Sequence, residues 1–136
     1  ETLLDVLREK AGVKSPKIGC ERGDCGSCTV LLDGRSVRAC LVLAVETDGA
    51  EITTLEGLGD DGLSALQQRL VEMSSFQCGF CAPGIILAVH ELMEGDPHPD
   101  RKEVEEAISG NLCRCTGYEP IVDAVMAVVG TGRATT

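Results

Sequence analysis

The sequence contains very few aromatic residues: two Phe, one Tyr and no Trp among 136 residues. The core must therefore be built from aliphatic side chains. The hydrophobic content of 43% supplies them and excludes an intrinsically disordered chain. Apolar runs such as Leu41–Val45 are far shorter than the roughly 20 residues that a membrane-spanning helix needs. We therefore expect a folded protein with no membrane span.

Positive charge is also scarce, because 12 basic residues stand against 22 acidic ones and leave a net charge of −10. Such a chain repels nucleic acid and anionic lipid, which excludes both as partners. Residues 1–57 carry a net charge of −3 and residues 58–136 a net charge of −7. No charged segment followed by an apolar one opens the sequence, so we expect no export signal and a cytoplasmic location.

Cysteine, by contrast, is abundant, at eight residues or about one in seventeen. Four cysteines fall in each half of the chain: Cys20, Cys25, Cys28 and Cys40, then Cys78, Cys81, Cys113 and Cys115. This division predicts two separate sites. Residues 57–62 have a loop composition, so we place a domain boundary there, with one domain over 1–57 and a second over 58–136.

The first half favours a short helix, a cysteine-bearing loop and a small sheet. Thr2 and Asp5 have the spacing of a capping box, and the leucines that follow Thr2 share one helical face. Residues 12–27 are rich in glycine and charge, which indicates a loop. Strands are predicted over 28–32 and 36–40 around an Asp33-Gly34 hairpin turn, with a third over 52–55.

The second half predicts four short helices. The first carries an apolar stripe made of Leu63, Leu66, Leu70 and Met73. Pro83 suits the first turn of the second helix, which ends within 95–99. Asp100 and Glu103 resemble a cap that opens the third, and Pro120 opens the fourth. Four short helices with short links are typical of a small bundle.

The first cysteine set has a spacing typical of one kind of metal centre. Its pattern is C-x4-C-x2-C-x11-C, and the opening C-x4-C-x2-C is the plant-type spacing for a [2Fe–2S] cluster. Three glycines lie among these cysteines and allow backbone N–H groups to turn toward the sulfurs. Cys40 arrives from the return strand of the hairpin and closes the predicted site.

The second set forms two close pairs that are distant in sequence, Cys78-x2-Cys81 and Cys113-x-Cys115. Each pair could take one iron of a two-iron cluster. Both pairs precede helices that begin with proline, and the positive end of a helix favours a negatively charged group. Phe76 and Phe80 flank Cys78, and we expect them to exclude water from this site.

Disulfide bonds and structural zinc are the alternatives on spacing alone. Disulfides need an oxidising compartment, which the absence of a visible export signal disfavours. Zinc could fill the second set with four thiolate ligands. It explains the first set poorly, because C-x4-C-x2-C with interleaved glycines is not the spacing of a zinc ribbon.

The segments around the cysteines resemble a known family. They read Gly19-Cys-Glu-Arg-Gly-Asp-Cys-Gly-Ser-Cys-Thr-Val30, Gln77-Cys-Gly-Phe-Cys-Ala-Pro-Gly84 and Gly110-Asn-Leu-Cys-Arg-Cys-Thr-Gly-Tyr118. In this order they are similar to the iron–sulfur subunit of the molybdenum hydroxylases, which include xanthine oxidase, aldehyde oxidases and carbon monoxide dehydrogenase. The resemblance extends over about residues 2–129.

The resemblance implies a plant-ferredoxin-like β-grasp domain followed by a four-helix bundle, each holding one [2Fe–2S] cluster. The cluster on Cys20, Cys25, Cys28 and Cys40 would lie nearer to FAD, and that on Cys78, Cys81, Cys113 and Cys115 nearer to molybdenum. Cys115 and Gln77 would also contact the molybdopterin. Family chains usually begin with a β-hairpin ahead of the Thr-Leu-Leu-Asp helix on which this sequence opens. We therefore expect the natural chain to start earlier, with the first hairpin of the 1–57 domain missing here.

The function implied is electron transfer rather than substrate chemistry. The chain would relay single electrons from molybdopterin in a large subunit to FAD in a medium subunit, within a dimer of heterotrimers, and would carry no catalytic residue. One alternative is an independent ferredoxin, for which a second cluster domain is unnecessary. A second is a succinate dehydrogenase-type subunit, but residues 78–115 lack the C-x2-C-x2-C-x3-C-P run that it needs. A third is a zinc-containing interaction module.

Overall fold

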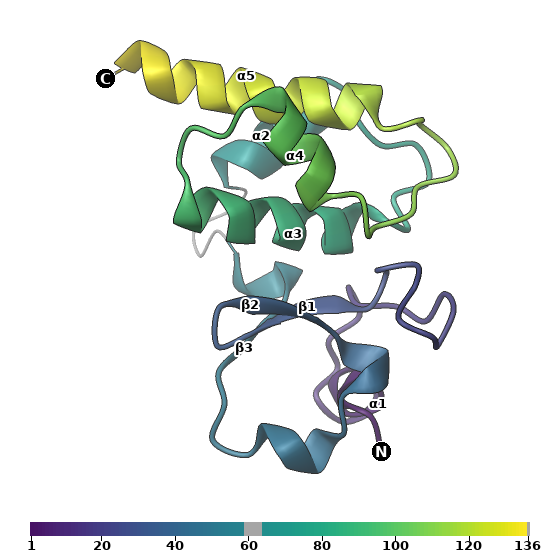
Figure 1. Ribbon diagram of the computed structural model, residues 1–136. Coiled ribbons are helices and arrows are strands. Elements are labelled where there is room, and N and C mark those ends of the chain that lie inside the picture. The colour runs from purple at the N-terminus through teal and green to yellow at the C-terminus, as the bar shows by residue number, and fades with distance from the viewer. Residues whose placement is uncertain (59–63, 136) are drawn as a thin grey trace.

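The computed structural model describes residues 1–58 and 64–135, with side chains described as far as Val129. Figure 1 shows two stacked parts, a small sheet with its surrounding loops and a group of helices. Most of the predicted boundary at 57–62 lies outside the described residues, as does Leu63 of the predicted stripe.

The chain begins with a capped helical segment. Helix α1 (Leu3–Asp5) continues into a π-helical turn over Val6–Lys10. The Thr2 hydroxyl accepts a hydrogen bond from the Asp5 N–H at 3.1 Å, and the Asp5 carboxylate accepts one from the Thr2 N–H at 3.3 Å. The predicted capping box is confirmed, and the leucines behind it are buried. The π-helical turn was not predicted.

The sheet has three antiparallel strands in the order β2-β1-β3. Strand β1 (Thr29–Leu32) pairs with β2 (Arg35–Arg38) and with the short β3 (Ile52–Thr53). Asp33 and Gly34 have φ values of 50° and 85°, as a two-residue hairpin turn requires, so the predicted turn is confirmed. The strands are shorter than predicted, because residues 39–41 form a 3-10 turn that takes Cys40 out of β2.

The four predicted helices are present. They are α2 (Ala65–Glu72), α3 (Ala82–Gly95), α4 (Arg101–Ala107) and α5 (Glu119–Thr135). Asp100 caps α4 with Glu103 as predicted, and Pro83 occupies the first turn of α3. Helix α2 packs against α5, and α4 packs against both α3 and α5.

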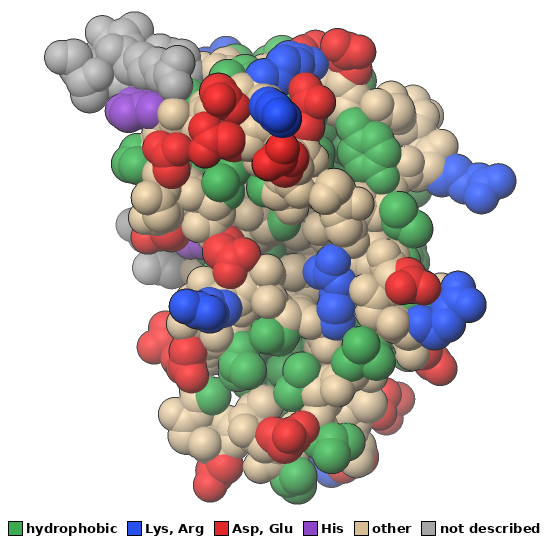
Figure 2. Space-filling model, in the orientation of Figure 1, with side chains coloured by type: hydrophobic (Ala, Val, Ile, Leu, Met, Phe, Trp, Pro, Cys, Tyr) green, Lys and Arg blue, Asp and Glu red, His purple; other side chains and the backbone are tan. Residues whose placement is uncertain are grey.

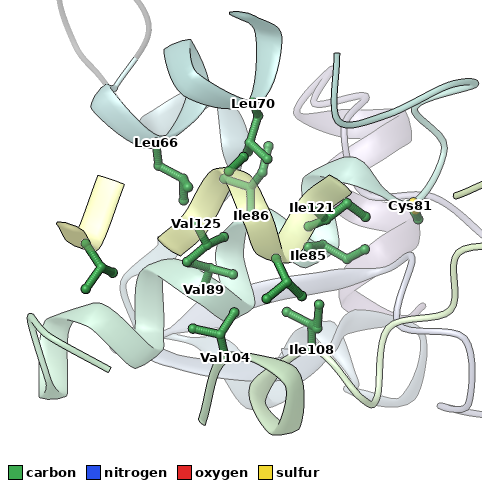
Figure 3. Packing of buried hydrophobic residues seen from close by; sticks show 13 residues of the cluster. Leu66, Leu70, Cys81, Ile85, Ile86, Val89, Val104, Ile108, Ile121 and Val125 are labelled. Carbon is green, nitrogen blue, oxygen red and sulfur yellow. The ribbon is translucent and has the colours of Figure 1, made fainter. Parts of the chain in front are cut away.

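Two aliphatic clusters form the core. Figure 3 shows the larger one, in which side chains of α2 to α5 meet between the helices. Its fully buried members include Ile85, Val104, Ile121 and Val125. A smaller cluster lies under the sheet and consists of Leu3, Leu4, Leu7, Cys28, Val30 and Ala39. The predicted stripe of α2 is only partly buried, since Leu66 and Leu70 face the core whereas Met73 is 41% exposed.

Helix α3 joins the two parts, because it packs against β1 and β2 as well as against α4. Figure 1 shows it lying between the sheet and the other helices. At this contact the Glu91 carboxylate accepts hydrogen bonds from the N–H of Ser36 at 2.7 Å and from its hydroxyl at 2.8 Å. The sheet and the helices are therefore tied together by polar groups as well as by apolar packing.

Within the described residues, no helix is both long enough and apolar enough to cross a bilayer.

Figure 2 shows acidic side chains gathered around a few basic ones over the helical part. In that region Arg101 pairs with Glu105, Glu119 and Asp123.

Candidate metal centres

The first cysteine set lies on a loop whose backbone turns toward sulfur. The Cys20 Sγ accepts hydrogen bonds from the N–H groups of Arg22 and Asp24 at 3.3 Å and of Cys25 at 3.4 Å. The Cys25 Sγ accepts one from the Ser27 N–H at 3.4 Å. These donors, led by the Arg22 N–H, lower the pKa of Cys20 to about 7, because they stabilise its thiolate.

Cys28 and Cys40 complete this set from a more buried position. Cys28 is 2% exposed and directly precedes β1, and it contacts Cys40 in the 3-10 turn that follows β2. Burial raises the pKa of Cys28 to about 11, since a thiolate loses its hydration there. Only a group that carries compensating positive charge, such as a metal, would hold this sulfur as a thiolate near neutral pH.

The loop leaves no room for an added side chain beside Cys25. A Cβ built on Gly19 would stand 2.6 Å from the Cys25 Sγ. Glu21 has a φ of 58° in this loop, a backbone conformation that L-residues rarely adopt. The loop is thus bent so that several N–H groups point inward, as a bound anionic cluster requires.

The second set lies where the loop before α3 meets the loop before α5. The sulfurs of Cys78 and Cys115 are 3.6 Å apart and both residues are exposed, whereas Cys81 is buried next to Cys113. Burial, with Cys113 beside it, raises the pKa of Cys81 to about 12. The Phe80 N–H lowers the pKa of Cys78, and the hydrogen bond to Cys78 raises that of Cys115.

The sulfurs of each set contact one another in two pairs, and in the second set each pair joins cysteines that are distant in sequence. Contacting pairs are Cys20 with Cys25, Cys28 with Cys40, Cys78 with Cys115, and Cys81 with Cys113. In the second set the sulfurs in contact thus belong to different sequence pairs, and which two thiolates share one iron stays a prediction. The two loops run side by side, and this places sulfurs of different loops closest to each other.

Two residues that sequence reasoning did not single out hold the Cys113 loop. The Tyr118 hydroxyl accepts a hydrogen bond from the Cys113 N–H at 2.8 Å and donates one to the Asn111 carbonyl at 3.0 Å. The Thr116 hydroxyl lies 3.2 Å from the Cys113 Sγ. Burial opposes ionisation of Cys113, but bonds with Thr116 and Cys81 outweigh it and lower its pKa. Tyr118 is the last residue of the segment Gly110–Tyr118 that resembles the family, and this resemblance is the sequence signal that could have identified it.

Gln77 lies beside this site, as its place before Cys78 predicts. Its side-chain amide donates a hydrogen bond to the backbone carbonyl of Cys115 at 3.0 Å, and both residues are exposed. Phe76 packs against the helical core, whereas Phe80 is 43% exposed, with the Lys17 ammonium 5.3 Å from the centre of its ring. The expectation that both rings exclude water from this site stays a prediction, with Phe80 the more exposed of the two.

The helices that follow the two cysteine pairs of the second set begin at different distances from the cysteines. Cys81 is the residue before the first turn of α3, so the N-terminus of that helix lies at the site as predicted. Helix α5 begins at Glu119, after a turn over residues 116–118. Both pairs therefore precede a helix as predicted; Cys81 lies directly at the start of α3, whereas residues 116–118 separate Cys115 from α5.

The donor set suits a two-iron cluster at each site. All eight cysteines are free thiols. Among the side chains that the structure describes, no three His, Cys, Asp or Glu groups converge closely enough to hold a single ion. Sulfurs that contact in pairs fit a cluster whose two irons each take two thiolates better than one tetrahedral zinc.

Comparison with known proteins agrees with this geometry. Residues 1–58 match the family model of a 2Fe-2S iron-sulfur cluster binding domain, and residues 54–126 match that of a [2Fe-2S] binding domain. The nicotine 6-hydroxylase small subunit of Paenarthrobacter nicotinovorans is 50% identical over 96% of this chain and 79% of that protein. The chain belongs to the iron–sulfur subunits of the molybdenum hydroxylases.

Solved structures support the assignment of this iron–sulfur subunit to the same family. Quinoline 2-oxidoreductase from Pseudomonas putida 86 superposes with a TM-score of 0.91 and 48% identity, over 98% of this chain and 84% of that one. An aldehyde oxidoreductase from Desulfovibrio gigas gives a TM-score of 0.92 and 43% identity, over 100% of this chain but 15% of that one. The same fold therefore also occurs as a small part of a much longer chain.

These matches confirm two predictions from the sequence. The iron–sulfur subunit carries two [2Fe–2S] clusters and is an electron-transfer component of an oxidoreductase. Its relatives include small subunits of multi-subunit complexes, which disfavours the independent ferredoxin. The ligands of each cluster and the domain boundary at 57/58 stay predictions.

Proposed function

We propose that this chain relays single electrons from molybdopterin in a large partner subunit to FAD in a medium partner subunit. The observation that carries the proposal is the division of eight free thiols into two sets of four, each made of two contacting sulfur pairs. When bound, each cluster supplies one-electron redox chemistry. We assign no bond-making role to any residue of the chain.

The proposed ligands follow the two sets. Cys20, Cys25, Cys28 and Cys40 would hold the cluster nearer to FAD, and Cys78, Cys81, Cys113 and Cys115 that nearer to molybdenum. We further propose that each contacting pair binds one iron. N–H groups directed at the Cys20 Sγ would stabilise negative charge, and burial of Cys28 and Cys81 would keep water from two of the sulfurs.

The proposed contact with molybdopterin lies at Gln77 and Cys115. Both residues are exposed, and one amide N–H of Gln77 is already held by the Cys115 carbonyl. This bond orients the amide, which has a second N–H and a carbonyl oxygen for a group bound beside Cys115. Gln77→Ala should therefore perturb the molybdenum spectrum more than the spectrum of either cluster.

Finer architectural features also belong to this proposal. We propose a β-grasp domain over 1–57, a four-helix bundle over 58–136, and assembly as a dimer of heterotrimers. The packing of α2 to α5 around one aliphatic core supports the bundle. We also propose a cytoplasmic location.

The test is an elemental assay of the complex purified without oxygen, with its subunits identified by mass spectrometry. About four irons and four acid-labile sulfides per copy of this chain are expected. Cys20→Ser and Cys78→Ser should each lower the iron to about two and leave the other cluster's spectrum intact. Zinc in place of iron, or loss of both clusters from either substitution, would contradict the assignment.

A further inference from the structure

A single guanidinium connects the two cysteine-bearing regions. Arg38 ends strand β2, and its side chain is partly buried. It donates three hydrogen bonds: from Nε to the Gly23 carbonyl at 3.2 Å, from Nη1 to the Thr29 hydroxyl at 2.6 Å, and from Nη2 to the Gly110 carbonyl at 2.8 Å. The acceptors come from three separate segments of the chain.

Each acceptor lies next to cysteines of one of the two sites. Gly23 belongs to the loop between Cys20 and Cys25, and Thr29 follows Cys28 directly. Gly110 lies just ahead of Cys113 in the other half of the chain. Arg38 therefore bonds a loop and the first residue of β1 beside the first set, and a loop beside the second set, through one planar group.

A buried amide reinforces this connection. Asn111 is 3% exposed, and its Nδ2 donates to the Gly26 carbonyl at 3.1 Å and to the Thr29 hydroxyl at 3.3 Å. The Thr29 hydroxyl in turn donates to the Gly26 carbonyl at 2.7 Å. The Leu112 N–H donates to the Cys25 carbonyl at 2.8 Å. We call the contacts of Arg38, Thr29, Asn111 and Leu112 across the halves the junction.

The junction has no spare room. A Cβ on Gly110 would stand 2.7 Å from the Arg38 Nη2, and one on Gly26 would stand 2.6 Å from the Asn111 Nδ2. Three hydrogen bonds hold Arg38 in this tightly packed site, so a side chain that cannot reach all three acceptors leaves at least one segment free to shift. The distance between the two cysteine sites therefore depends on the contacts of the Arg38 side chain.

Charge gives Arg38 a second effect. The chain has a net charge of −10, and thiolate-bound clusters add further negative charge. A guanidinium carries a full positive charge and is weakly hydrated, so it tolerates a partly buried site between two such groups. It would stabilise an added electron on either side.

We propose that Arg38 is a positioning residue that fixes the spacing of the two cluster-binding loops and places a positive charge between them. The proposal rests on the proposed function, since it presumes that each cysteine set holds a cluster. Arg38 contacts the loops through their backbone oxygens and one hydroxyl, so it acts through the loops rather than as a ligand.

The test compares Arg38→Gln and Arg38→Lys with Arg35→Gln in the complete complex. Arg35 is exposed at the other end of the same strand, which makes it a matched control. Electron paramagnetic resonance of the fully reduced protein reports the magnetic splitting between the clusters, which depends steeply on their separation. A redox titration reports the midpoint potential of each cluster.

Both Arg38 variants should lose or change the splitting, because neither side chain can make the three hydrogen bonds of the guanidinium. Arg38→Gln should also shift both midpoint potentials downward, since a positive charge is lost. Arg38→Lys should hold both potentials near those of the unaltered protein. Arg35→Gln should match the unaltered protein in splitting and in both potentials.

Unchanged splitting and potentials in both Arg38 variants, with full iron content, would overturn the proposal. So would loss of clusters from both variants while Arg35→Gln stays intact, because that result marks a purely structural role. A failure of the proposed function would be seen separately: the unaltered protein itself would then lack the two iron–sulfur clusters.

Discussion

Identical thiols in this chain differ in acidity because their surroundings differ. Cys20 is surrounded by backbone N–H groups, which lower its pKa to about 7. Burial raises the pKa of Cys28 to about 11 and that of Cys81 to about 12. An ordinary thiol has a pKa of about 8.5. Cluster incorporation must therefore remove protons that the buried members of each set hold most tightly.

Alkylation of the cluster-free chain should follow this order. Labelling of Cys20 by iodoacetamide should rise through pH about 7, because only the thiolate reacts. Cys28 and Cys81 should label slowly up to about pH 9, since they stay protonated and buried. Mass spectrometry of timed samples gives the rates. In urea all eight cysteines should react alike, and equal rates in the folded chain would contradict the assignment.

Tyr118 offers a test of the Cys113 loop. Tyr118→Phe removes the acceptor of the Cys113 N–H and the donor to the Asn111 carbonyl. Loss of both bonds in a partly buried site should cost about 1–2 kcal/mol. We expect the visible absorption of the second cluster to disappear at lower urea concentration than in the unaltered protein.

Ser109→Ala is the control for this change, because its hydroxyl makes only an exposed local bond to the Glu106 carbonyl. It should leave the urea midpoint nearly unchanged. Equal midpoints for Tyr118→Phe and Ser109→Ala would show that Tyr118 does not hold the loop.

At the scale of elements, helix starts were the most predictable feature. Thr2, Ser64 and Asp100 each form a reciprocal capping box, and two of these three were visible as spacings in the sequence. The ends of strands were less predictable. Cys40 lies beyond β2 in a 3-10 turn, where it contacts Cys28, and strand propensity alone does not predict where β2 ends.

The cap of α4 gives an element-scale prediction. The Asp100 carboxylate accepts a hydrogen bond from the Glu103 N–H at 2.8 Å. Asp100→Ala should lower the stability of the helical part by about 1 kcal/mol, because that N–H loses its partner. Thermal unfolding followed by circular dichroism measures the change. Lys102→Ala on the same helix is exposed and should have little effect, so equal losses would argue against the cap.

For the molecule as a whole, the contact between the halves is the least predictable part. The Arg38–Gly110 bond joins residues 72 positions apart, and the Ser36–Glu91 bonds join residues 55 apart. The cysteines could be assigned to two sites because their spacing reflects local loop geometry. Arg38 and Asn111 had no such signal, since most of their acceptors are backbone carbonyls that any sequence would present.

Close packing between the halves can be tested at Gly84. Its added Cβ would stand 2.4 Å from the Gly26 carbonyl oxygen and 2.9 Å from the Asn111 Nδ2. Gly84→Ala must therefore push α3 away from the loop, at a cost of about 1–3 kcal/mol. Gly95→Ala on the same helix meets nothing within 4 Å and is the control. A thermal midpoint that falls for Gly84→Ala and holds for Gly95→Ala is expected, and equal midpoints would contradict tight packing.

The acceptors at Gly23, Gly26, Cys25 and Gly110 have an evolutionary consequence. Every residue type has a main-chain carbonyl oxygen, so a substitution at these positions cannot remove the acceptor and can only shift its position. Selection at this contact then acts on few codons: those for the three donor side chains Arg38, Thr29 and Asn111, and those for the glycines whose replacement would clash. Substrate-specific divergence elsewhere in the complex could proceed while this small set stays fixed.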